Sequence, residues 1–398
     1  MEKKMKAVRM YADWVPRPDF VLGPKDIEGR QSYLGSKVWK NPRVEIEEVD
    51  VPEPKANEVL LQVKACGICG TDVHMLQTDD EGYMLYPGLT GFPATIGHEV
   101  SGVVVSAGPD ARDKNTNQPF KGGEAVCTEE MIWCGACKPC ADGYPNHCER
   151  LDEIGINIDG GFTKYLVVPD KVLWSLDPLK ERYNEKDIFK LGAFVEPTSV
   201  AYNAVIERGG GIRPGDNVVI CGGGPVGLAA IAILKRQGAA RVILSEPNPA
   251  RGSLGKKMGA DYVIDPVKES FPDRVLELTD GMGANLILEA TGLPTIVYPD
   301  IEKIVWDGRT LNCTIVVVAR ADAKMPVTGE VLQVRRASMV GAQGHSGHGT
   351  FPRVIQAMAS GMNMLPLITK EISLDEVPEN ILGLQTDKDN CKITCLMD

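Results

Sequence analysis

The chain has 398 residues, enough for two to three domains, and its 43% hydrophobic and 24% charged residues are typical of a globular protein. It contains 43 Lys and Arg against 54 Asp and Glu, so its formal net charge is −11. This excess of negative charge disfavours contact with a phosphate backbone or an anionic membrane, and we expect neither a nucleic-acid nor a membrane partner.

The first half of the chain alternates short apolar runs with Gly and Pro. The runs lie at 44–54, 58–67, 99–108 and 160–169. Short strands separated by such turns predict a β-rich domain of the barrel or sandwich type. Three further stretches, 11–40, 78–95 and 112–121, interrupt this pattern and are predicted to be excursions from that domain.

Beyond residue 188 the pattern changes to strands that alternate with helices. The expected elements are strands at 218–221, 241–245, 262–264 and 286–289 and helices at 227–236, 251–258 and 273–279. Such alternation predicts an α/β fold with a parallel sheet covered on both faces. Past residue 340 mixed elements return. We therefore expect a first domain over 1–197, a second over 198–336, and a segment 337–398 that rejoins the first.

The chain has 11 cysteines and no apolar signal segment at its start, so we expect a cytoplasmic protein with reduced thiols. Four of them lie close together, at Cys134, Cys137, Cys140 and Cys148. Four thiolates fill the tetrahedral shell that zinc prefers and leave no position for substrate, which predicts a structural zinc site. Chance clustering or two redox pairs are the alternatives.

A glycine-rich turn lies between the expected strand at 218–221 and the following helix. Its residues are Gly222, Gly224, Pro225, Val226 and Gly227. In a dinucleotide-binding turn, the first glycine permits the tight turn, the second lets the backbone approach a pyrophosphate, and the third allows close helix packing. The helix N-terminus would then face the phosphates. A turn without ligand is the alternative.

Glu246 follows the next expected strand, close to the spacing of the acid that binds the adenosine ribose. A carboxylate there accepts hydrogen bonds from two hydroxyls and repels a 2′-phosphate, so we expect NAD as the cofactor. Arg251 lies nearby and would suit that phosphate, which leaves NADP as the alternative.

A second metal site is suggested by residues far apart in the sequence. Cys69, His98, Glu99 and Glu196 together offer a thiolate, an imidazole and carboxylates, a mixed set that zinc accepts while an open position remains. Beside a nicotinamide, such a zinc would act as a Lewis acid on an alcohol. Each residue also has an ordinary alternative, since His98 suits a core with Glu99 as its partner and Cys66 with Cys69 could be a redox pair.

The motifs GICGTDVH, GHEVSG, VEPTSVA and GGGPVG, together with the four-cysteine segment, occur in the order found in zinc-dependent medium-chain dehydrogenases, which the chain resembles from about residue 44 to its end. The resemblance implies a GroES-like catalytic domain and a Rossmann coenzyme domain. It also implies that Cys69, His98 and Glu99 hold a catalytic zinc, with Glu196 as ligand or near-ligand, and that the four clustered cysteines hold a structural one.

The same resemblance implies a proton relay. Thr71 matches the hydroxyl residue that takes the substrate proton, and His74 matches the outer member that delivers it to solvent. A hydroxyl is donor and acceptor at once, and an imidazole titrates near neutrality. A local turn hydrogen bond and a surface histidine are the respective alternatives.

Two features resemble the polyol and threonine dehydrogenase branch: Gly70 follows the catalytic cysteine, and Glu196 stands where simple alcohol dehydrogenases carry a cysteine. Late in the chain, His345 and His348 lie in GAQGHSGHGT, where polyol dehydrogenases place substrate-facing residues. We consider both histidines candidates to hold ring hydroxyls, and a glycine-rich loop with solvated histidines is the alternative.

These inferences predict an enzyme with two zinc ions and NAD that oxidises a secondary hydroxyl of a cyclic polyol, of the inositol or inosose type. Threonine, butanediol and sorbitol dehydrogenases are the alternatives within the class. A zinc-binding Rossmann scaffold without turnover is the alternative from another class. We expect a homo-oligomer, a dimer or a tetramer.

Overall fold

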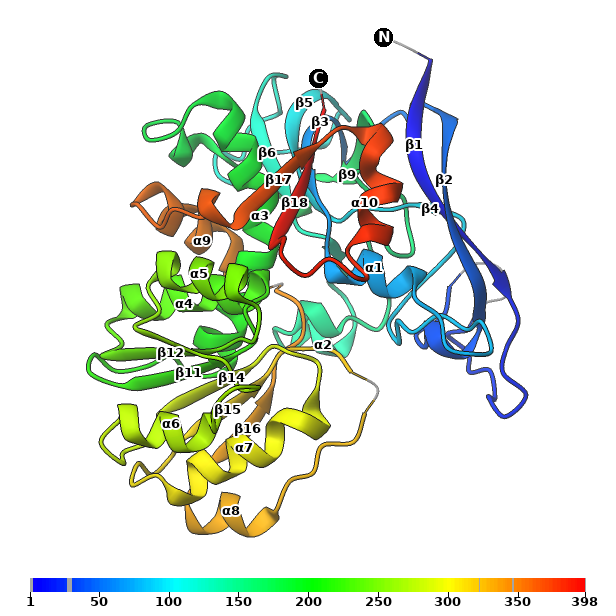
Figure 1. Cartoon of the computed structure of the whole chain (residues 1–398). Helices are drawn as coiled ribbons and strands as arrows, with labels where there is room; N and C mark the ends of the chain where they lie inside the picture. The colour runs from blue at the N-terminus through cyan, green and yellow to red at the C-terminus, as the bar shows by residue number, and fades with distance from the viewer. Residues whose placement is uncertain (1–2, 27–30, 322, 346, 398) are drawn as a thin grey trace.

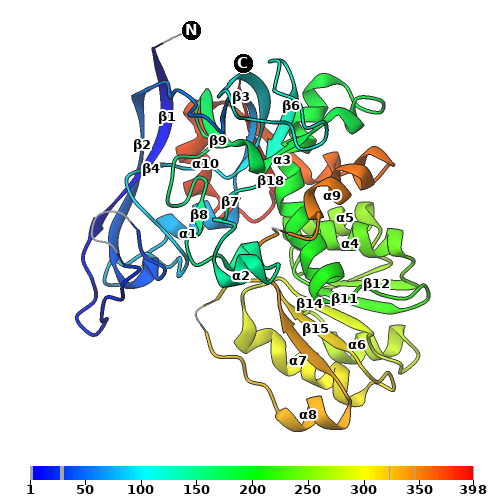
Figure 2. The same cartoon turned by 180° about the vertical axis from the view of Figure 1, so that it is seen from behind.

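The computed structural model describes residues 3–26, 31–321, 323–345 and 347–397. Part of the predicted excursion 11–40, at 27–30, and one residue of the glycine-rich loop, at 346, lie outside these ranges. A β-rich domain and an α/β domain lie side by side, and both views show the C-terminal end of the chain in the β-rich domain (Figures 1 and 2). No helix in the described ranges is long and apolar enough to cross a membrane.

The β-rich domain is built on a mixed sheet of strand order β10-β6-β5-β3-β18-β17, with β9 also paired to β3. Its strands are β3 (Glu58–Gly67), β5 (Glu99–Ala107), β6 (Ala125–Thr128), β9 (Tyr165–Pro169), β10 (Leu173–Ser175), β17 (Ile368–Ile372) and β18 (Lys392–Leu396). The last strand of the chain, β18, pairs antiparallel with β3 and parallel with β17. β18 therefore lies inside the sheet, between β3 and β17.

The α/β domain contains a parallel sheet of strand order β13-β12-β11-β14-β15-β16. The strands are β11 (Asn217–Cys221), β12 (Arg241–Ser245), β13 (Tyr262–Ile264), β14 (Leu286–Glu289), β15 (Thr314–Val317) and β16 (Ser338–Gly341). The strand order reverses at β11, and open α/β sheets bind ligands at the carboxyl ends of strands at such a point. The predicted domain limit at 336 falls before β16; the limits remain predictions.

Alternate residues of the parallel strands face opposite helical layers. Val218 and Ile220 pack in a cluster with α4 (Pro225–Gln237) and α5 (Pro249–Met258), whereas Val219 packs with α6 (Phe271–Leu278) and α7 (Pro294–Asp307). A strand buried on both faces is apolar at every position, which explains the unbroken run VVIC. The α/β prediction is confirmed.

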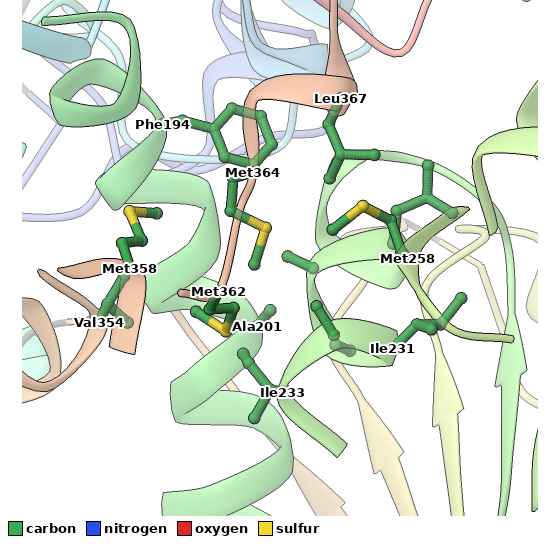
Figure 3. Packing of buried hydrophobic residues seen from close by; sticks show 14 of the residues in the cluster. Phe194, Ala201, Ile231, Ile233, Met258, Val354, Met358, Met362, Met364 and Leu367 are labelled. Carbon is green, nitrogen blue, oxygen red and sulfur yellow. The ribbon is translucent and has the colours of Figure 1, made fainter. Parts of the chain in front are cut away.

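One hydrophobic cluster joins the two domains. Helix α3 (Glu185–Tyr202) packs against α4 of the coenzyme domain and against α9 (Thr350–Ala359). Figure 3 shows Met358, Met362 and Met364 between these helices, with Phe194 above them. Methionine has an unbranched, flexible side chain that fills irregular gaps, so it suits a junction where elements from both domains meet.

Two of the three predicted excursions, 11–40 and 78–95, pack against each other. Strands β1 (Lys4–Trp14), β2 (Trp39–Asp50) and β4 (Ala94–Thr95) form a separate sheet, seen at one edge of the molecule in Figure 1. Trp39, 1% exposed, has its ring centroid 5.1 Å from those of both Trp14 and Phe92. Ser32 pairs with Thr90 as an isolated bridge. These two excursions therefore form one added layer, and its buried Trp39 and Phe92 belong to the same hydrophobic cluster as residues of β3 and β5.

We expect Trp39→Ala to lower the free energy of unfolding by about 3–5 kcal/mol, the range for large-to-alanine changes of buried aromatic residues. Urea unfolding followed by circular dichroism measures the change. Trp306→Ala is the matched control, because Trp306 is 43% exposed and should lose little. Equal losses in the two variants would show that the aromatic cluster does not hold the layer together.

Candidate functional site

The glycine-rich turn connects β11 to α4 at the point where the strand order reverses. Gly222 has φ of +103°, and a Cβ at Gly227 would lie 2.0 Å from the Gly222 carbonyl oxygen, so side chains are excluded at both positions. A Cβ at Gly224, the N-cap of α4, would instead point into open space. Pro225 and Val226 begin the helix, and its amides are available to a phosphate. This cradle fits a dinucleotide.

Glu246 directly follows β12 and is 7% exposed. One carboxylate oxygen accepts a hydrogen bond from the Gly223 amide at 2.7 Å, and the other accepts one from the Asn248 amide at 2.7 Å. A hollow of about 310 Å³ lies beside the carboxylate. Its lining residues include Asn248, Gly252 and Val263. The acid is thus fixed between the turn and a hollow where the adenosine half of a dinucleotide would fit.

Arg251 lies on α5 and points toward the other domain. Its Nη2 donates a hydrogen bond to the Asn390 carbonyl oxygen at 3.1 Å. The side chain of Asn248 likewise donates to Asp389 at 2.8 Å. The guanidinium therefore contacts the C-terminal segment, and its role toward the coenzyme stays a prediction.

The four clustered cysteines offer sulfur atoms within 4.8 Å of one another. Cys137 Sγ lies 3.4 Å from Cys140 Sγ and 3.8 Å from Cys148 Sγ. Zinc–sulfur bonds of about 2.3 Å in a tetrahedron place sulfur atoms about 3.8 Å apart, so the set fits a zinc ion.

Backbone amides favour the thiolate form of Cys134 and Cys137, whereas burial raises the pKa of Cys140 and Cys148. Ala136 N lies 3.4 Å from Cys134 Sγ, and Arg150 N lies 3.3 Å from Cys148 Sγ. The amide of Ala136 is the main reason why the pKa of Cys134 falls to about 6. Thiolates are the form that binds zinc, so the lobe is prepared for a cation.

Cys69 is the N-cap of α1 (Gly70–Leu76) and forms a capping box with Asp72. The third residue of the helix, Asp72, is fully buried and accepts a hydrogen bond from the Cys69 amide at 2.8 Å. The other oxygen of Asp72 lies 3.8 Å from His98 Nδ1. The Asp72 carboxylate thus holds the backbone of Cys69 and lies near His98, without a hydrogen bond to the imidazole within the described residues.

His98 and Glu99 lie at the start of β5, and their ligand atoms fall within 4.8 Å of that of Cys69. Burial alone would lower the pKa of His98, but the charges of Cys69 and Asp72 raise it well above its usual value. Negative charge that favours a proton on this imidazole would equally favour a zinc ion. The donor set therefore fits the predicted metal.

Glu99 also faces a buried cation from the end of the chain. Lys392, on β18, donates to Glu99 Oε1 at 2.5 Å and to the Ile68 carbonyl oxygen at 2.8 Å. Burial opposes the charge of this lysine, yet Glu99 raises its pKa. One oxygen of Glu99 is thus engaged, while Oε2 is buried without a hydrogen bond within the described residues.

Glu196 reaches the site from α3, beside Pro197, and is 5% exposed. Its nearest potential ligands are Glu130 and His345, whose ligand atoms lie with its own within 4.8 Å. Burial and then the charge of Glu99 raise the pKa of Glu196, so the acid also lies close to the predicted zinc ligands. Whether Glu196 binds zinc remains a prediction.

The structure places the remaining predicted residues in different surroundings. Thr71 Oγ1 lies 3.8 Å from Cys69 Sγ, close to the predicted metal. His74 is exposed on α1, and partial desolvation followed by the charge of Lys388 lowers its pKa. His345 is fully buried, but His348 is exposed at the start of α9 with φ of +53°. The geometry brings Thr71 and His345 to the site and leaves His348 at the surface.

Several residues of the site were not identified from the sequence. Glu130 and Glu153 add buried carboxylates, and burial raises the pKa of Glu153 to about 7. Tyr86, from the excursion 78–95, accepts a hydrogen bond from Arg320 Nη1 at 3.2 Å. Arg320 follows β15, so this contact shows that the carboxyl edge of the coenzyme sheet faces the catalytic domain. In the sequence, the acidic pair at 129–130, just before the zinc lobe, is the one signal that could have pointed to these buried carboxylates.

The two predicted zinc sites should respond differently to loss of a thiolate. We expect Cys137→Ser to lower the folded yield, since a structural zinc contributes on the order of 10–16 kcal/mol of binding in small domains. Cys69→Ser should give a folded protein that has lost one zinc and nearly all activity. Circular dichroism and elemental zinc analysis test this, and equal loss of folding would contradict the division into structural and catalytic sites.

Glu246→Ser should weaken NAD binding and relieve the repulsion of NADP. The expected shift in preference is about 1–3 kcal/mol, the range for hydrogen bonds to a charged group. Dissociation constants for NADH and NADPH, from fluorescence titration, measure it. Glu269→Ser, an exposed acid of the same domain, is the control. An unchanged ratio would mean that another residue binds the ribose.

Comparisons with known proteins agree with this geometry. The family described as "Alcohol dehydrogenase GroES-like domain" matches residues 55–178, and "Zinc-binding dehydrogenase" matches residues 225–360. A scyllo-inosose 3-dehydrogenase of Thermotoga maritima is 62% identical over 395 residues, which are 98% of this chain and 100% of that protein. An L-threonine 3-dehydrogenase of Pyrococcus horikoshii is 33% identical over 328 residues, 82% of this chain and 87% of that protein.

A solved structure from Thermotoga maritima, described as an alcohol dehydrogenase, superposes with a TM-score of 0.96 at 62% identity and covers 99% of this chain and 100% of its own. The fold, the order of the motifs and the family matches all coincide with the resemblance inferred from the sequence, which is confirmed. Since the identity extends over nearly the whole chain, the protein belongs to the zinc-dependent medium-chain dehydrogenases and is an oxidoreductase with GroES-like and Rossmann domains.

Proposed function

We propose that the enzyme uses zinc and NAD to oxidise a secondary hydroxyl of a cyclic polyol, with an inosose of the scyllo-inosose type as the substrate. The observation that carries the proposal is that Cys69, His98 and Glu99 bring their potential ligand atoms together. The buried carboxylates of Glu130 and Glu196 form a second such group with His345. Similarity to the Thermotoga maritima scyllo-inosose 3-dehydrogenase supports the ring substrate and oxidation at C3.

The residues of the chain have separate tasks in this reaction. Bound zinc would supply a Lewis acid and NAD a hydride acceptor. Cys69, His98 and Glu99 hold the metal, while Asp72 holds the backbone of Cys69. Lys392 balances the charge of Glu99 through a direct buried contact.

Thr71 and His74 move the substrate proton outward. The Thr71 hydroxyl lies near Cys69 and can accept a proton while it donates its own. His74 lies on the same helix and is exposed to solvent. The lowered pKa of His74 keeps its imidazole neutral near pH 7 and ready to accept the proton.

The coenzyme lies across the turn at the N-terminus of α4, with Glu246 on the adenosine ribose. The open space at Gly224 and the hollow beside Glu246 support this placement. Because Glu246 is anionic at the position of the 2′-hydroxyl, NAD is favoured over NADP. We further propose two zinc ions per chain, and a cytoplasmic homo-oligomer, a dimer or a tetramer.

The alternatives differ in substrate or in turnover. L-Threonine 3-dehydrogenases are related over most of the chain, so threonine is the first rival substrate; butanediol and sorbitol follow from the same branch. A zinc-binding scaffold without turnover is the rival from another class. The donor set of Cys69, His98 and Glu99 favours an enzyme, since a scaffold has no use for a metal site with an open position.

We expect scyllo-inosose to exceed L-threonine, 2,3-butanediol, sorbitol and ethanol in kcat/KM with NAD by several orders of magnitude. A pocket that pairs several hydroxyls rejects analogues that lack them, because its own polar groups would stay unpaired. Formation of NADH at 340 nm measures turnover, and Cys69→Ser controls for contaminating dehydrogenases. Threonine as best substrate would favour the first rival, whereas two bound zincs without turnover would favour the scaffold.

A further inference from the structure

The added layer reaches the coenzyme domain through a pair of side chains. Arg320 Nη1 donates a hydrogen bond to the Tyr86 hydroxyl at 3.2 Å, and the guanidinium carbon lies 5.3 Å from the centre of the Tyr86 ring. A Cβ at Gly88 would lie 2.5 Å from that hydroxyl and 2.6 Å from Arg320 Nη1, so both groups pack against the Gly88 backbone. We call this contact the Tyr86–Arg320 bridge.

The tyrosine end of the bridge is held in place by the catalytic domain. Tyr86 is 5% exposed and belongs to the hydrophobic cluster that contains Trp39. The Gly88 carbonyl oxygen accepts a hydrogen bond from the other excursion, at Gly35 N, with a length of 3.0 Å. Leu89 packs with cysteines of the zinc lobe. The Tyr86 hydroxyl is therefore fixed relative to both the added layer and the lobe.

The arginine end lies at the carboxyl edge of the coenzyme sheet. Arg320 follows β15, which pairs with β14. A Cβ at Gly292, just after β14, would lie 3.6 Å from the Arg320 carbonyl oxygen, and one at Gly222 would lie 2.9 Å from the Ala290 carbonyl oxygen. The glycine-rich turn, the end of β14 and Arg320 thus follow one another along this edge.

This order puts the bridge at the side where the nicotinamide would lie. Glu246, the predicted ribose acid, follows β12 on one side of β11, whereas β14 and β15 lie on the other side. A dinucleotide with its pyrophosphate at the glycine-rich turn extends across the point where the strand order reverses. With its adenosine at Glu246, its nicotinamide half would lie over the ends of β14 and β15, next to Arg320.

The bridge also lies close to the predicted zinc ligands. Burial and then the charge of Glu153 raise the pKa of Tyr86, and the charges of Arg320 and Cys69 act on the same hydroxyl. Burial raises the pKa of Glu153, whereas the charge of Arg320 lowers it. Attraction to Glu153 therefore adds to the hydrogen bond in drawing Arg320 toward the catalytic domain. The bridge joins the nicotinamide side of the predicted centre to its metal side.

We infer that Tyr86 is a positioning residue, which through Arg320 holds the nicotinamide end of the coenzyme sheet at a fixed distance from the predicted zinc. The inference rests on the proposed function. Hydride transfer needs the reacting atoms roughly 3–3.5 Å apart, and two domains of one chain move relative to each other unless their interface holds them. The hydrophobic cluster at α3 and α9 lies on the side away from the added layer (Figures 1 and 2), so the bridge supplies a second point of attachment.

Direct binding of the coenzyme by Arg320 is the rival role, because the arginine is exposed and a guanidinium suits a phosphate. The two roles predict different kinetics. In the rival role, loss of Arg320 weakens NADH binding and Tyr86 takes no part. In the positioning role, loss of either partner slows hydride transfer and leaves the affinity for the coenzyme intact.

Tyr86→Phe tests the inference because it removes the hydroxyl and keeps the ring. We expect the single-turnover rate of NADH formation from scyllo-inosose, measured by stopped flow, to fall roughly tenfold, the lower end of the effect of losing a hydrogen bond to a charged group. The NADH dissociation constant should stay within about twofold, because the bridge partner in the catalytic domain has no contact with the coenzyme turn.

The second partner and a control complete the test. Arg320→Met should slow the same step to the same extent, and the double variant should lose no more than either single variant, because one bond is broken in all three. Tyr83→Phe is the matched control and should retain the parental rate. Tyr83 lies in the same excursion and is 4% exposed, but its ring faces Arg17 of the added layer, at 3.9 Å.

Thermal melting and zinc analysis check folding and metal content in each variant. Hydrogen exchange followed by mass spectrometry adds a measurement independent of turnover: peptides over 84–92 and 314–321 should exchange faster in Tyr86→Phe and Arg320→Met than in the parent and in Tyr83→Phe. An unchanged rate in Tyr86→Phe, losses that multiply in the double variant, or NADH binding weakened by Arg320→Met alone would overturn the inference while the proposed function stands. No turnover of scyllo-inosose by the parent would remove the proposed function and the inference with it.

Discussion

The structure depends most on how it accommodates negative charge that is buried between its domains. Asp72, Glu99, Glu130 and Glu196 are all nearly inaccessible to solvent, and the thiol of Cys69 adjoins them. Isolated buried carboxylates are very unfavourable unless they are paired, protonated or bound to metal. Lys392 neutralises one of them through a direct contact with Glu99. Burial raises the pKa of Asp72, Glu130 and Glu196, so a cation bound beside these acids would offset a cost that Lys392 leaves in place.

The zinc lobe and the segment that carries His345 are physically connected. Asn146 lies in the lobe between the third and fourth cysteines, and its side chain holds the backbone next to His345. Gly344 in the same segment has Met131 against it, so a Cβ there would lie 2.2 Å from the methionine methyl group. Zinc in the lobe would therefore do more than stabilise a surface loop. It would also fix the segment that carries His345.

Local sequence signals predicted the elements that carry their own pattern. The strand 286–289 coincides with β14, and the turn at Gly222 to Gly227 has the expected contacts. The structure also brings the four cysteines together, as it does Cys69, His98 and Glu99, and it buries His345; their roles at a metal or substrate remain predictions. Glu130, Lys392 and Arg320 could not be found in this way, because single charged residues carry no periodicity and gain meaning only from partners distant in the chain. The exposure of His348 likewise depends on the conformation of a backbone turn, which the glycine-rich sequence does not determine.

The position of β18 has a consequence for how the molecule is made. This strand follows the whole Rossmann sheet in the sequence, yet it lies between β3 and β17 and brings Lys392 to Glu99. Until it is in place, the sheet has a gap at β3 and Glu99 has no cation beside it. The Rossmann sheet, from β11 to β16, is complete in sequence well before that moment. During synthesis the coenzyme sheet can thus form before β18 is available, while the metal centre is completed only once β18 has joined the other sheet.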